Sequence, residues 1–139
     1  MHTVHLVVNG TLMRGLALNG NLQAVGATFV RETTTAPVYR LWSIDDQYPA
    51  MQRVPSGGAA IAVEVWAVPV EHLWTILLQE PAGLCLGKVH LADGTEVLGV
   101  LGEAILCAGR REITQWGGWR AYTNRPPDTS SSPVTQEPA

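Results

Sequence analysis

The amino-acid sequence alternates short apolar runs with groups of turn residues along most of its 139 positions. These runs predict strands at residues 4–8, 28–34, 37–44 and 59–68. Ala36-Pro37 divides the second run from the third, because proline blocks continuous pairing, and the two are expected to be adjacent strands. Residues 45–58 are polar and contain prolines, so we expect a loop there. In the last strand the alternation predicts that Glu64 faces away from the core.

Two segments carry the three- and four-residue spacing that is typical of an amphipathic helix. The first covers residues 18–26, and Asn19 is placed to cap it. The second begins at Pro69 and ends at Glu80 or one residue earlier, because Pro81 disfavours helical geometry in the residue before it. Its expected apolar face consists of Val70, Leu73, Trp74, Leu77 and Leu78.

A hairpin is predicted in the second half of the chain. Apolar runs at residues 86–91 and 95–101 flank Asp93-Gly94, a pair that supplies the positive φ of a tight turn. Residues 103–108 predict a further strand after the hairpin. This part of the chain is therefore expected to be mainly β-structure.

The C-terminal residues 124–139 contain four prolines and three consecutive serines, and Val134 is their only large apolar residue. Such a composition cannot build a core and predicts a disordered tail. The preceding residues, 1–123, are expected to form one domain. With about six strands and two helices, the pattern predicts an α+β fold, a small mixed β-barrel with flanking helices.

Composition and charge narrow the function classes. The net charge of −3 gives no basic field for nucleic acid, and no apolar run reaches the length of a membrane span. Without a targeting pattern at the start, we expect a cytoplasmic protein, in which Cys85 and Cys107 are free buried thiols. The four histidines show no ligand spacing, so no metal or other cofactor is expected.

Three stretches are candidates for chemistry. The Asn9-Gly10-Thr11-Leu12 turn follows a strand, and its amides can converge on an anion; the alternative is a plain connection that needs Gly10 for its φ angle. Glu80 follows a helix, where the dipole does not favour an anion, and partial burial would raise its pKa toward that of a general base. An ordinary structural role is the alternative for Glu80. Residues 115–122 are rich in tryptophan and predict a C-terminal plug, with a lid or stacking platform as alternatives.

The sequence also resembles a known family. The segment NGTLMRG, at residues 9–15, looks like the Tyr-Gly-Ser/Thr-Leu loop of the gamma-glutamylcyclotransferase-like superfamily. The segments TAPVYRL, GGAAIAVEVW, GKVHLADGTEV and GGWRAY, in this order, resemble the C-terminal domain of allophanate hydrolase, which belongs to the same superfamily. The resemblance implies a small barrel whose mouth holds a carboxylate-bearing substrate. It places substrate-binding groups at Asn9, Gly10, Thr11, Leu12, Arg14, Tyr39 and Arg120.

The resemblance implies two kinds of activity. In the cyclotransferases a glutamate after a helix moves a proton from the substrate amine to the departing amine, and this position falls on Glu80. That reaction is intramolecular aminolysis of a γ-glutamyl-type amide, with Glu80 as general acid and base. Asn9, however, stands where the cyclotransferases have tyrosine, and the allophanate-type domains generally have no glutamate at the Glu80 position. The alternatives are action on a carbamate intermediate of urea degradation, with a separate amidase as partner, or a non-catalytic ligand-binding module.

Overall fold

The computed structural model describes residues 2–127, and in this part of the chain eight strands form two sheets. The larger sheet has the order β2-β5-β1-β7-β6, in which β1 is antiparallel to β5 and parallel to β7. Its strands are β1 (Thr3–Val8), β2 (Thr28–Thr34), β5 (Ala62–Pro69), β6 (Leu84–His90) and β7 (Glu96–Gly102). The smaller sheet, with the order β4-β3-β8, contains β3 (Tyr39–Ile44), β4 (Tyr48–Arg53) and β8 (Arg111–Glu112).

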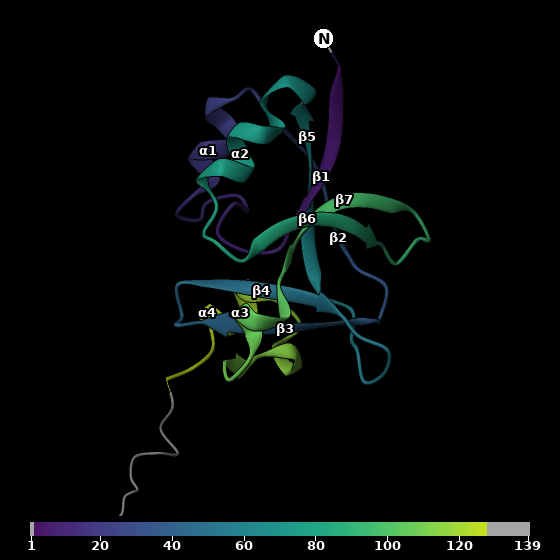
Figure 1. The fold of residues 1–139 in the computed structure, drawn as a ribbon, viewed down its shortest axis with the longest axis vertical. Coiled ribbons are helices and arrows are strands. Elements are labelled where there is room, and N and C mark those ends of the chain that lie inside the picture. Colours follow the sequence, from purple (N-terminus) through teal and green to yellow (C-terminus); the bar gives the residue numbers. More distant parts are fainter. Residues whose placement is uncertain (1, 128–139) are drawn as a thin grey trace, which may run out of the picture.

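Figure 1 shows β1 and β5 in the upper half of the molecule and β3 and β4 in the lower half. The sheets are joined by a hydrogen bond of 3.1 Å from the Gln52 side chain to the main-chain oxygen of Gly102, and by one of 2.9 Å from the His90 amide to the Tyr39 hydroxyl. The α+β class is therefore confirmed. Over the described residues, however, the ladders form two separate sheets and not one continuously hydrogen-bonded barrel.

The strand predictions at residues 4–8, 28–34 and 37–44, and the hairpin around Asp93-Gly94, are confirmed. Two predictions about their neighbourhood are wrong. β2 pairs with β5 whereas β3 pairs with β4, so these two runs lie in different sheets. The expected loop at 45–58 contains β4, because Asp45 and Asp46 both adopt positive φ, of 54° and 57°, and turn the chain into a tight hairpin.

The first helix, α1 (Asn19–Ala24), differs from expectation at its start. Asn19 is the first helical residue and makes no side-chain cap bond. Its buried side-chain amide donates a hydrogen bond of 2.8 Å to the main-chain oxygen of Leu12 instead. The cap prediction failed because a tertiary partner, seven residues back in the chain, competes for the same side chain.

The second helix, α2 (Leu73–Gln79), ends where Pro81 predicts and follows a 3-10 turn, η1 (Val70–His72). Pro69 is the last residue of β5 and not the first of the helix. The packed side of α2 is centred on Ile76, which is 2% exposed. Val70, Trp74 and Leu78 share the opposite side and are 50, 61 and 75% exposed, so the predicted apolar face was wrong at these three positions, whereas Leu73 packs against the core. The segment carries two apolar stripes, and spacing alone does not decide which of them is covered.

The remaining short elements follow β7. Residues 103–108 form the helix α3 (Ala104–Cys107) and not a strand, since Cys107 and Ala108 donate helical bonds to Glu103 and Ala104. The chain then forms η2 (Thr114–Trp116) and α4 (Trp119–Thr123). Cys85 and Cys107 are free; Cys107 is buried and Cys85 is half-buried. No helix of the described chain is long and apolar enough to cross a bilayer.

The segment 115–122 packs as the predicted plug. Trp119 and Tyr122 are buried, and the Tyr122 hydroxyl donates a hydrogen bond to the Asp46 carboxylate. Arg125, which falls in the predicted tail, lies over the Tyr122 ring at 3.9 Å and donates to its main-chain oxygen. The rest of the tail prediction, from residue 128 onward, lies outside the described residues.

Candidate functional site

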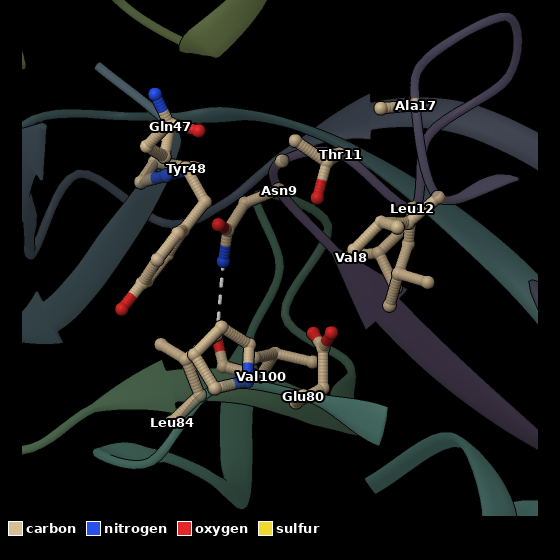
Figure 2. Close-up of a pocket in the computed structure, with 14 residues that line it drawn as sticks. Val8, Asn9, Thr11, Leu12, Ala17, Gln47, Tyr48, Glu80, Leu84 and Val100 are labelled. Carbon is tan, nitrogen blue, oxygen red and sulfur yellow. Dashed lines mark hydrogen bonds between the residues drawn. The ribbon is translucent and has the colours of Figure 1, made fainter. Parts of the chain in front are cut away.

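A cavity of about 400 Å³ lies beside the end of β1. Most of its lining comes from residues 8–12, the start of β4 with Gln47, and the segment after α2 with Glu80 (Figure 2). Ala17, Leu18 and Val100 complete the walls. We call residues 9–14 the glycine turn. The sequence candidates Asn9, Gly10, Thr11, Leu12 and Glu80 are thus brought together, although about 70 residues separate the turn from Glu80.

Gly10 is required in the glycine turn for a steric reason. A Cβ atom at this position would lie 2.4 Å from Cδ of Pro49, the second residue of β4. Gly10 is not among the glycines with positive φ, so the simpler explanation of a φ requirement does not apply. The glycine therefore permits close contact between the turn and the start of β4.

The residues at the two ends of the glycine turn make hydrogen bonds, whereas two main-chain amides in its middle make none within the described chain. Met13 donates its amide to the main-chain oxygen of Gly10 at 3.0 Å, and Asn9 donates its side-chain amide to that of Val100 at 3.0 Å. Within residues 2–127, no protein acceptor takes a hydrogen bond from the amide nitrogen of Thr11 or Leu12. Both residues line the cavity, so both amides are available to an anionic group of a ligand.

Glu80 provides the acid–base group of the cavity. It follows α2 in an extended conformation, with φ −81° and ψ 150°. Burial raises the pKa of its carboxyl from 4.5 to about 7, because the apolar walls disfavour the charged form. Near neutral pH the group is present in comparable amounts as acid and as carboxylate. In Figure 2 the Glu80 carboxylate and the Thr11 hydroxyl point toward one another from opposite walls.

The start of β4 supplies cavity residues that sequence analysis missed. Gln47, Tyr48 and Pro49 line the wall that adjoins the glycine turn. Burial is the main cause that raises the pKa of the Tyr48 phenol, and the charge of Glu80 raises it further. The phenol therefore stays protonated at neutral pH and can act as a hydrogen-bond donor. The prediction of a hairpin here would have located these residues, but the prolines made the segment resemble a loop.

Three sequence candidates lie outside this cavity. Tyr39 is fully buried in the core, where its hydroxyl accepts a hydrogen bond of 2.9 Å from the His90 amide. Arg14 and Arg120 instead form ion pairs with Glu64, at 3.3 and 3.0 Å. The structure therefore separates these three residues from the group that surrounds Glu80.

Glu64 is buried, contrary to the expectation that it faces away from the core. β5 lies between β1 and β2, and the face that carries Glu64 is covered by Arg14 and Arg120. Burial raises the pKa of Glu64, but hydrogen bonds from the Arg14 amide, Trp66 and the two arginines outweigh it, and the pKa is lowered overall. The alternation along the strand correctly placed Glu64 on the face opposite to Val63 and Val65, but it did not show that both faces of the strand are covered.

Comparisons with known proteins agree with this architecture. An AIG2-like protein from Mus musculus, 19% identical over 78% of this chain and 82% of its own, has the same fold with a TM-score of 0.59. The fold is thus that of the gamma-glutamylcyclotransferase-like proteins. The family model of the allophanate hydrolase C-terminal domain matches residues 4–124, and the chain belongs to this family.

Relatives of the family differ greatly in length. A uropathogenic E. coli-specific protein of known crystal structure shares 55% sequence identity with this chain. The two structures superpose with a TM-score of 0.88, and the match covers 90% of this chain and 98% of that one. Allophanate hydrolase from Kluyveromyces lactis is 29% identical, with a TM-score of 0.83, over 88% of this chain and 21% of that one. Urea amidolyase from Saccharomyces cerevisiae is 32% identical over 127 residues, and the chain spans 7% of its length.

Proposed function

We propose that the protein is an enzyme that breaks a carbon–nitrogen bond in a small amide or carbamate carrying a carboxylate, with Glu80 transferring the proton. The observation that carries this proposal is the Glu80 carboxyl, whose pKa burial raises to about 7, inside a cavity lined by the glycine turn. A group with this pKa can both accept and donate a proton near neutral pH. Among the described residues, it is the only carboxyl that lines the cavity.

The first candidate reaction is intramolecular aminolysis of a γ-glutamyl-type amide. The substrate amine attacks its own γ-carbonyl carbon and gives a proton to the Glu80 carboxylate. The resulting acid then protonates the departing amine as the old carbon–nitrogen bond breaks. The amides of Thr11 and Leu12 are the donors available for the substrate carboxylate. General acid–base transfer of this kind contributes about 10²–10⁴-fold to a rate.

The second candidate reaction is decarboxylation of a carbamate, and family membership favours it. Here the protonated Glu80 gives its proton to the carbamate nitrogen while the carbon–nitrogen bond breaks and carbon dioxide leaves. The relatives named allophanate hydrolase and urea amidolyase motivate a carbamate produced from allophanate by a separate amidase. In this reaction Glu80 acts once, as an acid.

A substrate panel tests the proposal. Wild type, Glu80→Gln and the matched control Glu71→Gln are assayed with γ-glutamyl amino acids, γ-glutamyl-ε-lysine, and allophanate supplied with a purified amidase. Formation of 5-oxoproline reports aminolysis, and acceleration of carbon dioxide release beyond the amidase alone reports decarboxylation. Glutamine keeps the size of Glu80 but cannot take up a proton, so turnover is expected to fall about 10²-fold or more. Glu71 is exposed in η1, so its variant should match wild type.

The pH profile separates the two reactions. Aminolysis needs the carboxylate of Glu80, so its rate should decline as pH falls through about 7. Decarboxylation needs the acid, so its rate should decline as pH rises through the same value. Equal turnover by wild type and Glu80→Gln contradicts proton transfer by this residue. A wild type that binds small carboxylates without turnover identifies a non-catalytic binding module.

A further inference from the structure

The glycine turn is held by an unusual share of the buried polar side chains. In residues 2–127 the buried polar or charged residues are Asn9, Asn19, Thr35, Ser43 and Glu64. Three of these five side chains bond within or from residues 9–14. Burial of a polar group costs free energy unless it is hydrogen-bonded, and a buried charge costs more. Three buried polar side chains that bond to one turn therefore indicate that the turn is held in a defined conformation.

Glu64 fixes the far end of the turn. Its Oε1 atom accepts a hydrogen bond of 2.9 Å from the main-chain amide of Arg14, and its Oε2 atom accepts one of 3.0 Å from Arg120. The same Arg120 amino group also donates to the main-chain oxygen of Arg14. The amide and the carbonyl of Arg14 are thus both held, one by Glu64 directly and the other through Arg120.

Two asparagines fix the rest of the turn. Asn9 bonds to Val100 at the beginning of the turn, and Asn19 bonds to the main-chain oxygen of Leu12 in its middle. Gln23 donates a hydrogen bond of 2.7 Å to the side-chain oxygen of Asn19, which orients the Asn19 amide toward Leu12. The two free amides, of Thr11 and Leu12, lie between these fixed points.

We propose that Glu64 is a positioning residue for substrate binding, which it serves by holding the glycine turn so that the Thr11 and Leu12 amides face an anionic group of the substrate. Glu64 does not line the cavity, so it acts through the turn and not by contact with substrate. Arg14 and Arg120 belong to this support and not to the substrate-binding surface. The inference rests on the proposed function, since that function defines what the turn binds.

The test compares Glu64→Gln with Glu32→Gln in the full chain. Glu32 also pairs with Arg14, at 2.6 Å, but it is 66% exposed and bonds to the guanidinium and not to the turn backbone. Glutamine at position 64 still accepts from the Arg14 amide but loses the charge that pairs with both arginines. We expect the amide resonances of Thr11 and Leu12 to shift and their hydrogen exchange to accelerate about tenfold, as expected for local opening.

Kinetics and binding measurements provide values that would not change if Glu64 only stabilised the fold. In Glu64→Gln the KM should rise about tenfold while kcat changes less than threefold and its apparent pKa stays near the wild-type value, because Glu80 is untouched. The Kd of glutarate, which has the γ-glutamyl carbon chain but no bond to cleave, should weaken by the same factor. Glu32→Gln should match wild type in each measurement.

A milder variant keeps the inference testable if Glu64→Gln does not fold. Arg120→Lys retains the positive charge but removes the planar group that joins Glu64 to the Arg14 oxygen, and smaller changes in the same amides are expected. If the folded variants lose thermal stability while amide exchange, Kd and KM match Glu32→Gln, the inference is overturned. A wild type without turnover overturns the proposed function alone, since amide exchange and glutarate binding still decide the role of Glu64.

Discussion

Asn9 and Val100 join two strands where their main-chain pairing has stopped. The parallel ladder between β1 and β7 contains the pairs Leu6↔Leu98 and Val7↔Gly99, and the Asn9 side chain then donates to the Val100 oxygen at 3.0 Å. Asn9 is 5% exposed, so this bond forms away from water. The residue that stands in place of the cyclotransferase tyrosine therefore anchors the entry to the glycine turn.

Replacement of Asn9 should consequently lower the stability of the fold. Asn9→Ala leaves the Val100 oxygen without its donor and should reduce the free energy of unfolding by about 1–3 kcal/mol. Urea denaturation followed by tryptophan fluorescence measures the loss. Asn124→Ala, at an exposed position, is the control and should stay within about 0.5 kcal/mol of wild type. A loss for Asn9→Ala no greater than that of the control contradicts the anchoring role.

Two glycine substitutions should have opposite effects. Gly10→Val places atoms where Pro49 already lies, so we expect a loss of about 1–3 kcal/mol from overpacking, together with weaker ligand binding. Gly20→Ala is the matched control. It lies in α1 without a positive φ, and its added Cβ meets no atom within 4 Å, so it should stabilise the protein by about 0.5–1 kcal/mol. Equal thermal shifts for the two variants would show that the contact with Pro49 relaxes freely.

Much of the secondary structure could be predicted because its causes are local. Asp93-Gly94 specifies a tight turn through backbone conformation, and Gly94 indeed has φ +90°. Pro81 ends α2 through a clash with the preceding residue. Such effects act within a few residues and can be read from the chain.

What could not be predicted depends on tertiary packing. Periodicity shows which residues share a face but not which face is covered, and this is why the environments of Glu64 and Trp74 were assigned incorrectly. Prediction of the candidate site also required knowledge of the tertiary packing. Glu80 and Thr11 meet only because the fold brings α2 beside the glycine turn, and the family resemblance, not the spacing, anticipated their meeting.

The exposed side of α2 leads to a simple stability contrast. Trp74 is 61% exposed, so Trp74→Gln should change the free energy of unfolding by no more than about 0.5 kcal/mol. Ile76, two residues away, is 2% exposed, and Ile76→Ala should cost about 2–5 kcal/mol through lost burial and a cavity. Thermal denaturation of both variants checks the contrast. Comparable losses for the two substitutions would mean that Trp74 packs against the fold.

Glu80 should make the stability of the protein depend on pH in a direction opposite to that of most carboxyl groups. Its pKa is about 7 in the folded protein against an ordinary value of 4.5, so between these values the folded state binds more protons than the unfolded state. The contribution of Glu80 to stability should therefore be complete below about pH 4.5 and be lost as pH rises through about 7. Because each tenfold difference in proton affinity corresponds to about 1.4 kcal/mol, a pKa raised from 4.5 to about 7 limits the decline to about 3.5 kcal/mol.

Comparison with Glu80→Gln isolates this effect from other titrating groups. Glu64 and Asp46 have lowered pKa values and act in the opposite direction, with stability lost as pH falls through those values. These residues are shared by wild type and Glu80→Gln, so their contributions cancel in the difference between the two unfolding free energies. That difference should shift in favour of Glu80→Gln between pH 5 and 8, whereas Glu71→Gln should follow wild type throughout. A constant difference across this range would show that the Glu80 carboxyl ionises as freely in the folded protein as in water, and a general base poised near neutral pH would then be lost with it.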